Sequence, residues 1–479
     1  MRLTILGGGG FRVPLVYRAL LADHRRTGIT EVALHDVDAG RLAGVGRVLT
    51  ALARDVPDAP AVVTTTDLGE AVTGAAFVFC AIRVGGLRGR VRDERVALGL
   101  GVLGQETVGA GGLSYGLRTV PVAHHIAATV ARLAPEAWTI NFTNPAGLVT
   151  EAMTAELGDR VIGICDSPAG LADRVLRAAG ADPATTRVDY AGLNHLGWLY
   201  GLHPVGDAVP GSLSGSVGGA VPGLSSGSLS GFTGGAAPGA ADLLPGLLAD
   251  GALLGTIEEG RLFGVDRLRE LGAIPNEYLH YYYDPAGTLA AVRAADQTRG
   301  EFLLEQQDRC YTSLAGPGDP LETWLGAWRE REATYMAENR ELAGAGERAH
   351  DESRPAGYEG VALSVMRALA RDEPARLILN VRNQGTLSVL DNDAVIEVPC
   401  TVDAGGAAPE PVAPLPEHGV GLVRAVKSAE RGVLEAAASG SRLAAVRAMA
   451  AHPLVDSERL AARLVDAYRA EFSELSYLR

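Results

Sequence analysis

The sequence opens on a short apolar run that passes directly into four consecutive glycines, Gly7-Gly8-Gly9-Gly10. Residues 2–6 are typical of a β-strand, and a helical pattern follows from about Pro14 to Asp23. Glycines between a strand and a helix let the backbone approach a pyrophosphate, which then lies on the N-terminus of the helix. This order of elements predicts a dinucleotide-binding turn.

An acidic residue follows at the position where such a turn needs one. A second predicted strand over residues 31–36 ends in Asp36, 29 residues after Gly7. An acid there binds a ribose 2′-hydroxyl, which favours NAD over NADP. Four glycines alone would equally suit a tight turn without a ligand, so the prediction depends on the whole series of elements. We expect the NAD site to contain Gly7, Gly8, Gly9, Gly10, Phe11 and Asp36.

Strands and helices alternate along the rest of the first part of the chain. Further strands are predicted at residues 61–65, 75–81, 138–143 and 161–165. This alternation predicts an α/β protein with an N-terminal Rossmann-type, doubly wound parallel sheet. Strands are predicted again at residues 377–381, 386–390 and 394–398.

Two domains are expected from this organisation. Residues 1–170 form the NAD-binding domain, and residues 171–479 form a C-terminal α/β (α+β) domain for substrate and metal. Residues 205–241 are rich in Gly, Ser, Ala and Pro and show no apolar period, which predicts a flexible surface insertion.

Charge and composition exclude several classes of protein. The net charge of −14 argues against a nucleic-acid-binding protein, although local arginines can still bind a small anionic substrate. No apolar run approaches the roughly 20 residues that span a bilayer. The first residues indicate a strand rather than a secretion signal, and the four cysteines show no paired spacing. We expect a cytoplasmic protein with no membrane partner.

Cys165 and His195 are candidate metal ligands. Cys165 ends a predicted strand, and Ser167 and Pro168 suit the cap and first turn of a helix. Ligands bind at that edge of such sheets, and a thiol and an imidazole are soft-to-borderline metal ligands. A lone buried cysteine or histidine more often serves packing. The metal prediction therefore depends on the Cys-Asp-Ser-Pro and Asn-His contexts.

Several longer motifs occur in a fixed order. They are Gly104-Gln-Glu-Thr-Val-Gly-Ala-Gly-Gly-Leu113, Gly116-Leu-Arg-Thr-Val-Pro121, Asn141-Phe-Thr-Asn-Pro-Ala-Gly147, Cys165-Asp-Ser-Pro168, Gly192-Leu-Asn-His195 and Tyr278-Leu-His-Tyr-Tyr282. On these motifs the chain resembles glycoside hydrolase family 4, and within it the 6-phospho-β-glucosidase branch. The resemblance covers most of the chain, is densest over residues 1–200 and weakens through the insertion and the C-terminal third.

The resemblance implies a lactate/malate dehydrogenase-like glycosidase fold with a Rossmann-type domain and a substrate domain. It implies that NAD and a divalent metal, usually Mn²⁺, are needed although the net reaction is hydrolysis. The implied route oxidises C3 of the sugar, removes the acidified C2 proton, expels the aglycone from C1, adds water and returns the hydride. The expected partner is a phosphorylated sugar glycoside, and the expected assembly is a homodimer or homotetramer.

The resemblance also assigns roles to the metal and catalytic residues. Cys165 and His195 would bind the metal and leave positions for sugar hydroxyls and water. Tyr278 would be the base at C2, and the neighbouring tyrosines 281 and 282 are the alternatives. A tyrosine needs help from a nearby cation, since its ordinary pKa is about 10. Asp166 occupies the place of a proton donor in α-specific members, where some β-specific members carry Asn. Three roles stay open for Asp166: a proton donor, a group that acts through a water molecule, and an outer contact of the metal.

Substrate contacts are implied for Arg90, Asn144 and Arg299, with Asn141 and Glu106 as orienting groups. Arg90 lies in the strongest local cluster of positive charge, which includes Arg83, Arg88, Arg92 and Arg95. Arginine forks suit a phosphate. Any other member of the cluster could equally belong to a solvated helix face.

The chain departs from the family pattern after the glycines. Phospho-specific members often carry Ser-Ser-Tyr-Thr, whereas this chain has Gly10-Phe11-Arg12-Val13. Either Arg12 binds the phosphate in place of the hydroxyls, or the substrate is an unphosphorylated glycoside. The phosphate is favoured because the rest of the pattern agrees with that branch.

Other functions remain as alternatives. The same mechanism could act on an α-linked glycoside. An NAD-dependent hydroxy-acid dehydrogenase would share the glycine turn, and net reduction of NAD would reveal it. A non-catalytic NAD-binding sensor would not need Cys165 or His195. The Cys/His pair and the Asn-Pro-Ala-Gly motif weigh against both.

Overall fold

The computed structural model describes residues 1–205, 241–334 and 357–479. The insertion predicted over residues 205–241 lies outside the described residues except for its two end positions.

The N-terminal part of the chain forms six parallel strands in the order β3-β2-β1-β4-β5-β6. Their bounds are β1 Arg2–Leu6, β2 Glu31–His35, β3 Ala61–Thr65, β4 Ala75–Cys80, β5 Trp138–Asn141 and β6 Val161–Gly163. This order is that of a doubly wound dinucleotide-binding sheet. The predicted Rossmann-type α/β fold is confirmed.

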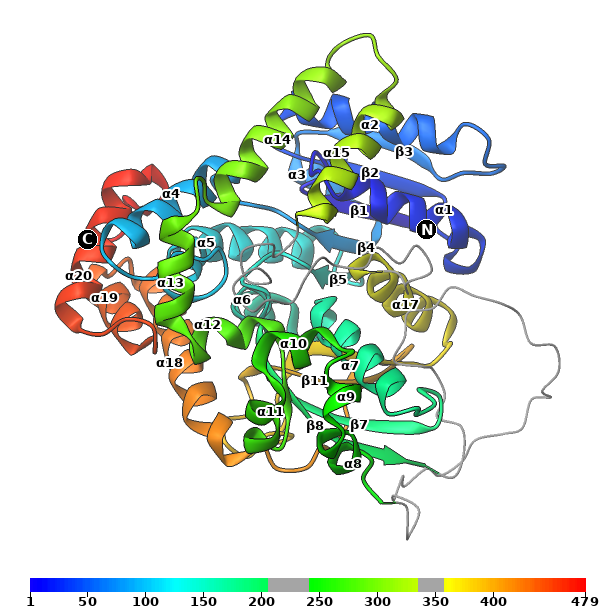
Figure 1. The fold of residues 1–479 in the computed structure, drawn as a ribbon. Helices are drawn as coiled ribbons and strands as arrows, with labels where there is room; N and C mark the ends of the chain where they lie inside the picture. The colour runs from blue at the N-terminus through cyan, green and yellow to red at the C-terminus, as the bar shows by residue number, and fades with distance from the viewer. Residues whose placement is uncertain (206–240, 335–356) are drawn as a thin grey trace.

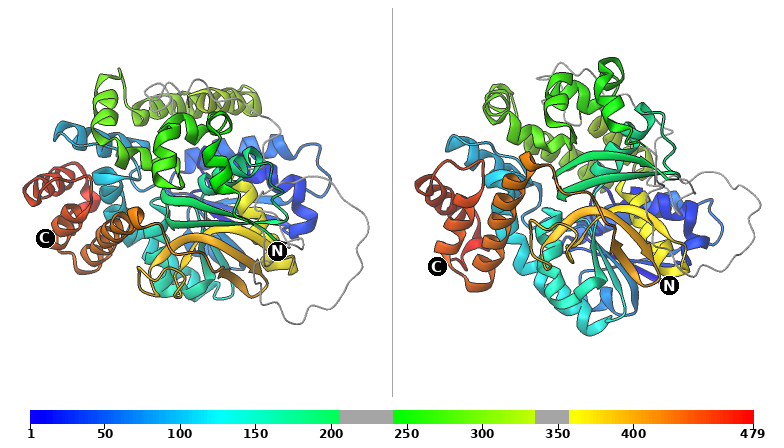
Figure 2. Two further views of the ribbon diagram at one scale, coloured as in Figure 1. Left: turned by 60° about the horizontal axis from the view of Figure 1, so that its bottom comes forward. Right: turned by 90° about the horizontal axis from the view of Figure 1, so that it is seen from below.

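The same sheet continues through the C-terminal part of the chain. Its further strands are β7 Thr186–Leu193, β8 Leu196–Pro204, β9 Ile274–Pro275, β10 Ala375–Arg382, β11 Val395–Asp403 and β12 Gly406–Pro409. Strand β10 pairs antiparallel with β6, and the order beyond it is β11-β7-β8-β9. Figure 2 shows the yellow and orange strands β10 and β11 beside the green hairpin of β7 and β8. Because one sheet runs through both parts, the boundary at residue 170 stays a prediction.

The strand predicted at residues 386–390 is wrong. This segment is a loop between β10 and β11 that the buried side chain of Asn383 closes. The Asn383 amide donates to the carbonyls of Leu387, Leu390 and Asp391, and its oxygen accepts from the Leu387 amide. Asparagine side chains compete with strand pairing in this way.

Helices cover both faces of the sheet (Figure 1). The helices of the first half are α1 Val13–Thr27, α2 Ala39–Ala53, α3 Leu68–Val72, α4 Gly86–Gly99, α5 Gly109–Leu133, α6 Ala146–Leu157 and α7 Ser167–Ala178, with a short η1 at Gly158–Arg160. The middle of the chain adds α8 Leu244–Ala249, α9 Gly251–Leu254, α10 Glu258–Phe263, α11 Val265–Leu271, η2 Glu277–Leu279, α12 His280–Tyr283, α13 Pro285–Ala294, α14 Arg299–Leu314 and α15 Pro320–Ala333. The last are α17 Tyr358–Arg371, α18 Glu417–Ser439, α19 Arg442–Ala451, α20 Glu458–Glu471 and η3 Ser473–Leu475.

Two apolar cores hold the elements that carry the site. The larger core joins the strands to α1, α2 and α17, and the second joins α5 to the C-terminal helices α18, α19 and α20 (Figure 1). None of the helices in the described part of the chain is both long and apolar enough to cross a membrane.

Candidate active site

A cavity with a volume of about 950 Å³ lies at the carboxyl edge of the parallel strands. Residues from both parts of the chain line it. Among the predicted site residues, the lining contains Gly7, Gly10, Phe11, Arg12, Asp36, Arg90, Asn144, Cys165, Asp166, His195, Tyr278 and Arg299. Residues separated by nearly 300 positions in the sequence therefore meet in one place, where a doubly wound sheet binds its ligands.

The glycine turn gives the cavity its first wall. Gly7 has φ +83°, and a Cβ atom there would lie 2.4 Å from the carbonyl oxygen of Ala81. The Gly7 and Gly8 amides donate to the His35 carbonyl over 2.9 and 2.7 Å. Gly8 and Gly9 pack against the end of β2 and the start of α2, so their contribution is close approach of backbone rather than cavity surface. A turn that only glycine fits, followed at once by α1, suits a pyrophosphate.

Asp36 holds the turn against the second strand. Its carboxylate accepts from the Gly9 amide over 3.0 Å and from the Asp38 amide over 3.1 Å. The side chain lines the cavity at the end of β2. This is the place of the acid that binds an adenosine ribose in NAD-binding sheets, so the residues present fit the dinucleotide.

Phe11, predicted to bind the cofactor, also packs against helix α15. Its ring is 5% exposed and lies against Trp324 and Trp328 of α15. The Trp324 indole donates to the Phe11 carbonyl over 2.9 Å. Phe11 therefore fastens α15 to the glycine turn in addition to lining the cavity.

Cys165 and His195 face each other across the cavity wall. The Sγ atom of Cys165 lies 3.6 Å from Nε2 of His195. Cys165 follows β6, and His195 lies in the tight turn between β7 and β8 with φ +60°. The Thr107 hydroxyl lies 2.9 Å from Nδ1 of His195, which fixes the ring so that Nε2 points toward the thiol.

The chemistry of this pair fits a divalent ion. A thiolate and an imidazole are suitable ligands for a borderline transition metal. Within the described ranges, no group of three or more His, Cys, Asp or Glu side chains is arranged to hold a metal. Two protein ligands would leave positions open for substrate oxygens and water.

Both groups are neutral at pH 7 before a metal binds. Burial, reinforced by the charges of Glu397 and Asp166, raises the pKa of the Cys165 thiol well above 9. Burial lowers the pKa of His195 to about 4. A metal would therefore displace the thiol proton, and its affinity would rise with pH.

Tyr278 stacks directly on His195. The two rings are parallel within 1°, and their centroids are 3.6 Å apart. The side chain of Asn276 fixes this arrangement, because its oxygen accepts from the Tyr278 amide while its amide donates to the Ser167 hydroxyl over 3.0 Å. The phenol is thereby tied to the start of α7, directly after Asp166.

The two alternative tyrosines occupy different positions. Tyr281 lines the cavity, and its ring centroid lies 6.2 Å from that of Tyr278. The Tyr282 hydroxyl instead lies 3.3 Å from Nε2 of His452, and burial raises the pKa of this phenol. Tyr282 is not among the lining residues. Of the three tyrosines, Tyr278 and Tyr281 therefore face the cavity.

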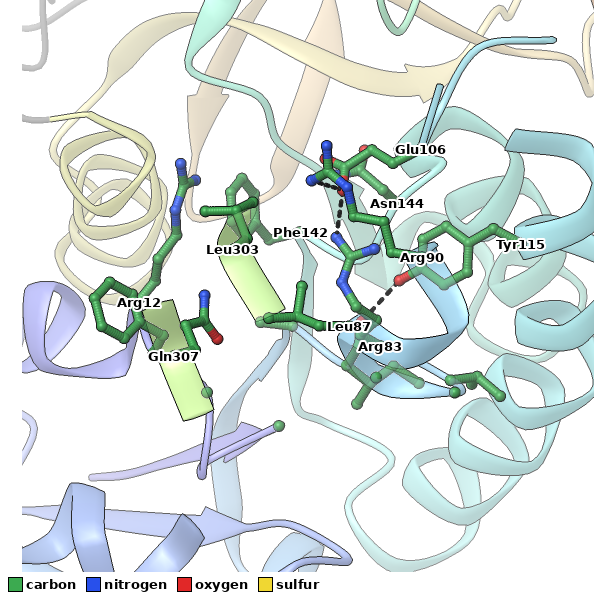
Figure 3. Close-up of a pocket in the computed structure, with 18 of the residues that line it drawn as sticks. Arg12, Arg83, Leu87, Arg90, Glu106, Tyr115, Phe142, Asn144, Leu303 and Gln307 are labelled. Atoms are coloured by element: carbon green, nitrogen blue, oxygen red, sulfur yellow. Dashed lines mark hydrogen bonds and ion pairs between the residues drawn. The ribbon is translucent and has the colours of Figure 1, made fainter. Parts of the chain in front are cut away.

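Arg83 and Arg90, which both line the cavity, meet on one carboxylate. Figure 3 shows both guanidinium groups converging on Glu106, with nitrogen–oxygen distances of 2.8 and 2.5 Å. Burial alone would raise the pKa of Glu106, but the charges of Arg90 and Arg83 outweigh it and hold that pKa well below its usual range. Glu94 also accepts from Arg90, over 2.8 Å. The other arginines of α4 are exposed. Arg88, which also lines the cavity, pairs with Asp308, and Arg92 and Arg95 pair with Glu471 and Glu301.

Asn144 is presented by a tightly bonded turn. The buried amide of Asn141 donates to the carbonyls of Thr143 and Ala146 and to the hydroxyl of Thr150. The Thr143 amide returns a bond to the Asn141 oxygen. Asn141 thus fixes the turn that carries Asn144, which lines the cavity.

Arg299 starts α14 and contacts the end of α15. Its guanidinium donates to the Thr334 hydroxyl over 2.8 Å and to the Arg331 carbonyl over 3.2 Å. Arg331 also lines the cavity, although no motif pointed to it. In the sequence it lies in a run of alternating charges that is typical of a solvated helix face. Two further residues support the site. Thr107 lies inside one of the motifs recognised in the sequence, and Asn276 lies outside all of them.

The doubly wound sheet, the glycine turn and the Cys/His pair define an α/β protein of the dinucleotide-binding class. The chain belongs to the family 4 glycosyl hydrolases: the family model matches residues 2–181, and the model of the family's C-terminal domain matches residues 190–455. The predicted family is confirmed.

Curated relatives carry both linkage specificities. The chain is 29% identical over 474 residues to a probable 6-phospho-β-glucosidase of Bacillus subtilis, covering 97% of this chain and 95% of the relative. It is 28% identical over 410 residues to a 6-phospho-α-glucosidase of Lacticaseibacillus paracasei, covering 85% and 82%.

Solved structures share the fold. A 6-phospho-α-glucosidase from gut microorganisms, in complex with NAD and Mn²⁺, matches with a TM-score of 0.77 at 23% identity and covers 100% of this chain and 99% of its own. The 6-phospho-β-glucosidase of Thermotoga maritima, with manganese, NAD⁺ and glucose 6-phosphate, matches with a TM-score of 0.76 at 23% identity and covers 98% of both chains.

Proposed function

We propose that this chain is an NAD- and divalent-metal-dependent glycosidase that hydrolyses 6-phospho-β-glucosides. The observation that carries the proposal is the 3.6 Å approach of Cys165 Sγ and His195 Nε2 in the cavity that the glycine turn opens into. A hydride acceptor and a Lewis acid would then act on one sugar ring. The family relatives with NAD and Mn²⁺ support both cofactors, and Mn²⁺ is the metal that we propose.

When bound, NAD⁺ would supply reversible oxidation of the sugar at C3, and a divalent ion, which Cys165 and His195 would hold, would supply Lewis acidity. Oxidation at C3 acidifies the C2 proton, so a modest base can remove it. Tyr278 takes this role because its ring is held against His195 and its turn is fastened to α7. Arg90 and Asn144, which also line the cavity, orient the sugar.

Asp166 is the proposed proton donor to the departing aglycone. It directly follows Cys165 and lines the cavity, so its carboxyl group and the metal pair would face the same ring. A family acid at this place is typical of α-specific members, and two of the curated relatives are 6-phospho-α-glucosidases. Hydrolysis of an α-linked 6-phosphoglucoside is therefore the second candidate.

The proposed active site combines residues from both sides of the predicted domain boundary. Residues 1–170 would hold NAD, but they also supply Cys165 to the metal, whereas His195 and Tyr278 come from residues 171–479. A homodimer or homotetramer and a cytoplasmic location remain predictions.

The test is the release of p-nitrophenol from four compounds under reducing conditions: the β- and α-glucosides and their 6-phosphates, each with and without NAD⁺ and Mn²⁺. We expect turnover of the 6-phospho-β-glucoside that is lost when either cofactor is omitted. Turnover of the α-linked phosphate would select the second candidate. Stoichiometric accumulation of NADH without p-nitrophenol would instead indicate a dehydrogenase.

A further inference from the structure

Glu397 lies in the row of residues that joins the two strands leading to the candidate metal ligands. Its side chain on β11 is fully buried. On one side Glu397 pairs in register with Asn380 of β10, and Asn380 pairs in turn with Gly163 of β6, two residues before the cysteine ligand. On the other side Glu397 pairs with Gly192 of β7, three residues before the histidine ligand. A carboxyl group therefore lies in the sheet between the two ligand strands.

One carboxylate oxygen of Glu397 is connected to the turn that holds His195. The side-chain amides of Asn194 and Asn380 both donate to this oxygen, each over 3.0 Å. Asn194 directly precedes His195, whose φ of +60° is unfavourable for a residue with a Cβ atom. The bond to Asn194 thus helps to hold the turn in the conformation in which Nε2 of His195 faces Cys165.

The other carboxylate oxygen of Glu397 is connected to the turn that holds Tyr278. The Tyr190 hydroxyl donates to this oxygen over 2.8 Å. The side chain of Asn276 also bonds to the Tyr190 hydroxyl, and its oxygen accepts from the Tyr278 amide. Tyr190 and Asn276 are both fully buried. Glu397 therefore reaches the proposed base through two buried side chains.

Glu397, Asn194 and Tyr190 are not among the residues that line the cavity, so any effect on the reaction must pass through their neighbours. Buried polar groups that bond to one another resist rearrangement, because leaving one of them without its partner costs free energy. We propose that Glu397 is a positioning residue with two branches: its bond to Asn194 sets His195 for the metal, and its bond to Tyr190 sets Tyr278 for proton removal. The Tyr278 branch rests on the proposed function, whereas the His195 branch requires only that the protein binds a metal.

Mn²⁺ affinity tests the His195 branch without turnover. Mn²⁺ is titrated calorimetrically into the full-length protein with NAD⁺. Asn194→Ala and Glu397→Met should each weaken Mn²⁺ binding by about 10- to 100-fold, as is usual when a residue that orients a metal ligand is lost. The double variant should lose no more than the weaker single variant, because both changes remove the same bond. Asn194 is partly exposed, so its variant tests the branch even if Glu397→Met does not fold.

Glu397→Gln separates hydrogen bonding from charge. The glutamine oxygen accepts from Asn194 and Asn380, and its amide group can bond to the Tyr190 hydroxyl. This variant should bind Mn²⁺ as the parent protein does.

Tyr190→Phe tests the Tyr278 branch, because it removes only the bond to the second carboxylate oxygen. It should lower kcat for a 6-phosphoglucoside by up to about 100-fold, the cost of a small misplacement of a reacting group. KM and Mn²⁺ affinity should stay nearly unchanged, since the bond between Glu397 and Asn194 remains.

Asp189→Asn is the matched control. Asp189 is a buried carboxylate on the same strand as Tyr190, but it binds Arg187 and His203 instead of the site. This variant should lower the Tm and keep the Mn²⁺ affinity and kcat of the parent protein. A purely structural role for Glu397 would give Glu397→Met the same behaviour.

Unchanged Mn²⁺ affinity in Asn194→Ala and in folded Glu397→Met would overturn the inference. A loss of affinity in Glu397→Gln as large as that in Asn194→Ala would also overturn it, because charge rather than hydrogen bonding would then be responsible. Weakened Mn²⁺ binding in Asn194→Ala, in a protein that hydrolyses no glycoside, would keep the His195 branch and reject the proposed function. Normal kcat in Tyr190→Phe would keep the function and reject the Tyr278 branch.

Discussion

The thiol of Cys165 and the imidazole of His195 lie 3.6 Å apart, although one follows the parallel strand β6 and the other the antiparallel strand β7. The junction of the two halves of the sheet therefore places the pair in the cavity. The hydroxyl of Thr107 turns the imidazole so that Nε2 meets the sulfur. A metal ion bound there would bridge the two halves.

Replacing the thiol should remove the metal. Cys165→Ser is expected to lower Mn²⁺ affinity by more than about 100-fold, because even outer-shell partners of ligands change affinity 10- to 100-fold. Metal content after dialysis and Mn²⁺ titration of activity measure this. Cys310→Ser is the control, since Cys310 is buried in α14 away from the cavity. Equal metal content in the two variants would reject Cys165 as a ligand.

The proposed base can be separated from its neighbours. Tyr278→Phe should lower kcat by about 10²- to 10⁴-fold, the usual contribution of a general base, and leave Mn²⁺ affinity nearly unchanged. Tyr282→Phe should retain most activity, because the Tyr282 hydroxyl contacts His452 instead of the cavity. A large loss of kcat in Tyr282→Phe together with nearly normal kcat in Tyr278→Phe would assign the base to Tyr282 instead.

Asp36 should decide cofactor preference. Asp36→Asn is expected to weaken NAD⁺ binding by about 10-fold and to raise the relative affinity for NADP⁺, because the acid both accepts from ribose and repels a 2′-phosphate. Fluorescence titration with the two cofactors gives the ratio. Asp173→Asn, which removes a surface partner of Arg177, should leave the ratio unchanged. An unaltered ratio in Asp36→Asn would place the ribose elsewhere.

The buried carboxyl group of Glu397, near Cys165, should make the stability of the protein depend on pH. Burial raises the pKa of Glu397 to about 7, although Asn194, Tyr190 and Asn380 donate to it. Since this value exceeds the ordinary 4.5, the contribution of Glu397 to stability is complete below about pH 4.5 and is lost as the pH rises through 7. The metal-free protein should lose roughly 3 kcal/mol over this interval relative to Glu397→Gln.

Urea unfolding in EDTA at a series of pH values measures the difference. Glutamine keeps an acceptor for the two asparagines and a group that Tyr190 can bond. The free energy of unfolding of Glu397→Gln should therefore change less with pH than that of the parent protein. Parallel curves for the two proteins would show that Glu397 does not titrate in this range.

The sequence was sufficient for features that depend on local patterns. The glycine turn, the acid at the end of β2 and the alternation of strands and helices are each readable within a short window. The hairpin of β7 and β8 gave no such signal, because both faces of these strands are buried and no alternation of polar and apolar residues remains. The false strand at residues 386–390 has apolar residues at strand spacing, but the side chain of Asn383 determines its path.

The same distinction between local patterns and distant contacts applies to the residues of the site. Those inside recognised motifs, such as Cys165 and His195, line the cavity. Arg331 and Asn276 could not be found this way. Arg331 lies in a run of alternating charges, and Asn276 is placed by its contact with Ser167, which is distant in the sequence. Glu397 contacts Asn194 across a strand pair formed only in the folded protein.

The most direct measurement of the central claim is the fate of hydrogen at C2 of the sugar. A 6-phospho-β-glucoside would be hydrolysed in D₂O with NAD⁺ and Mn²⁺, and the released glucose 6-phosphate would be analysed by NMR. Oxidation at C3 and proton removal by Tyr278 predict solvent deuterium at C2 of the product. Product that retains only its original hydrogen at C2 would contradict the elimination route.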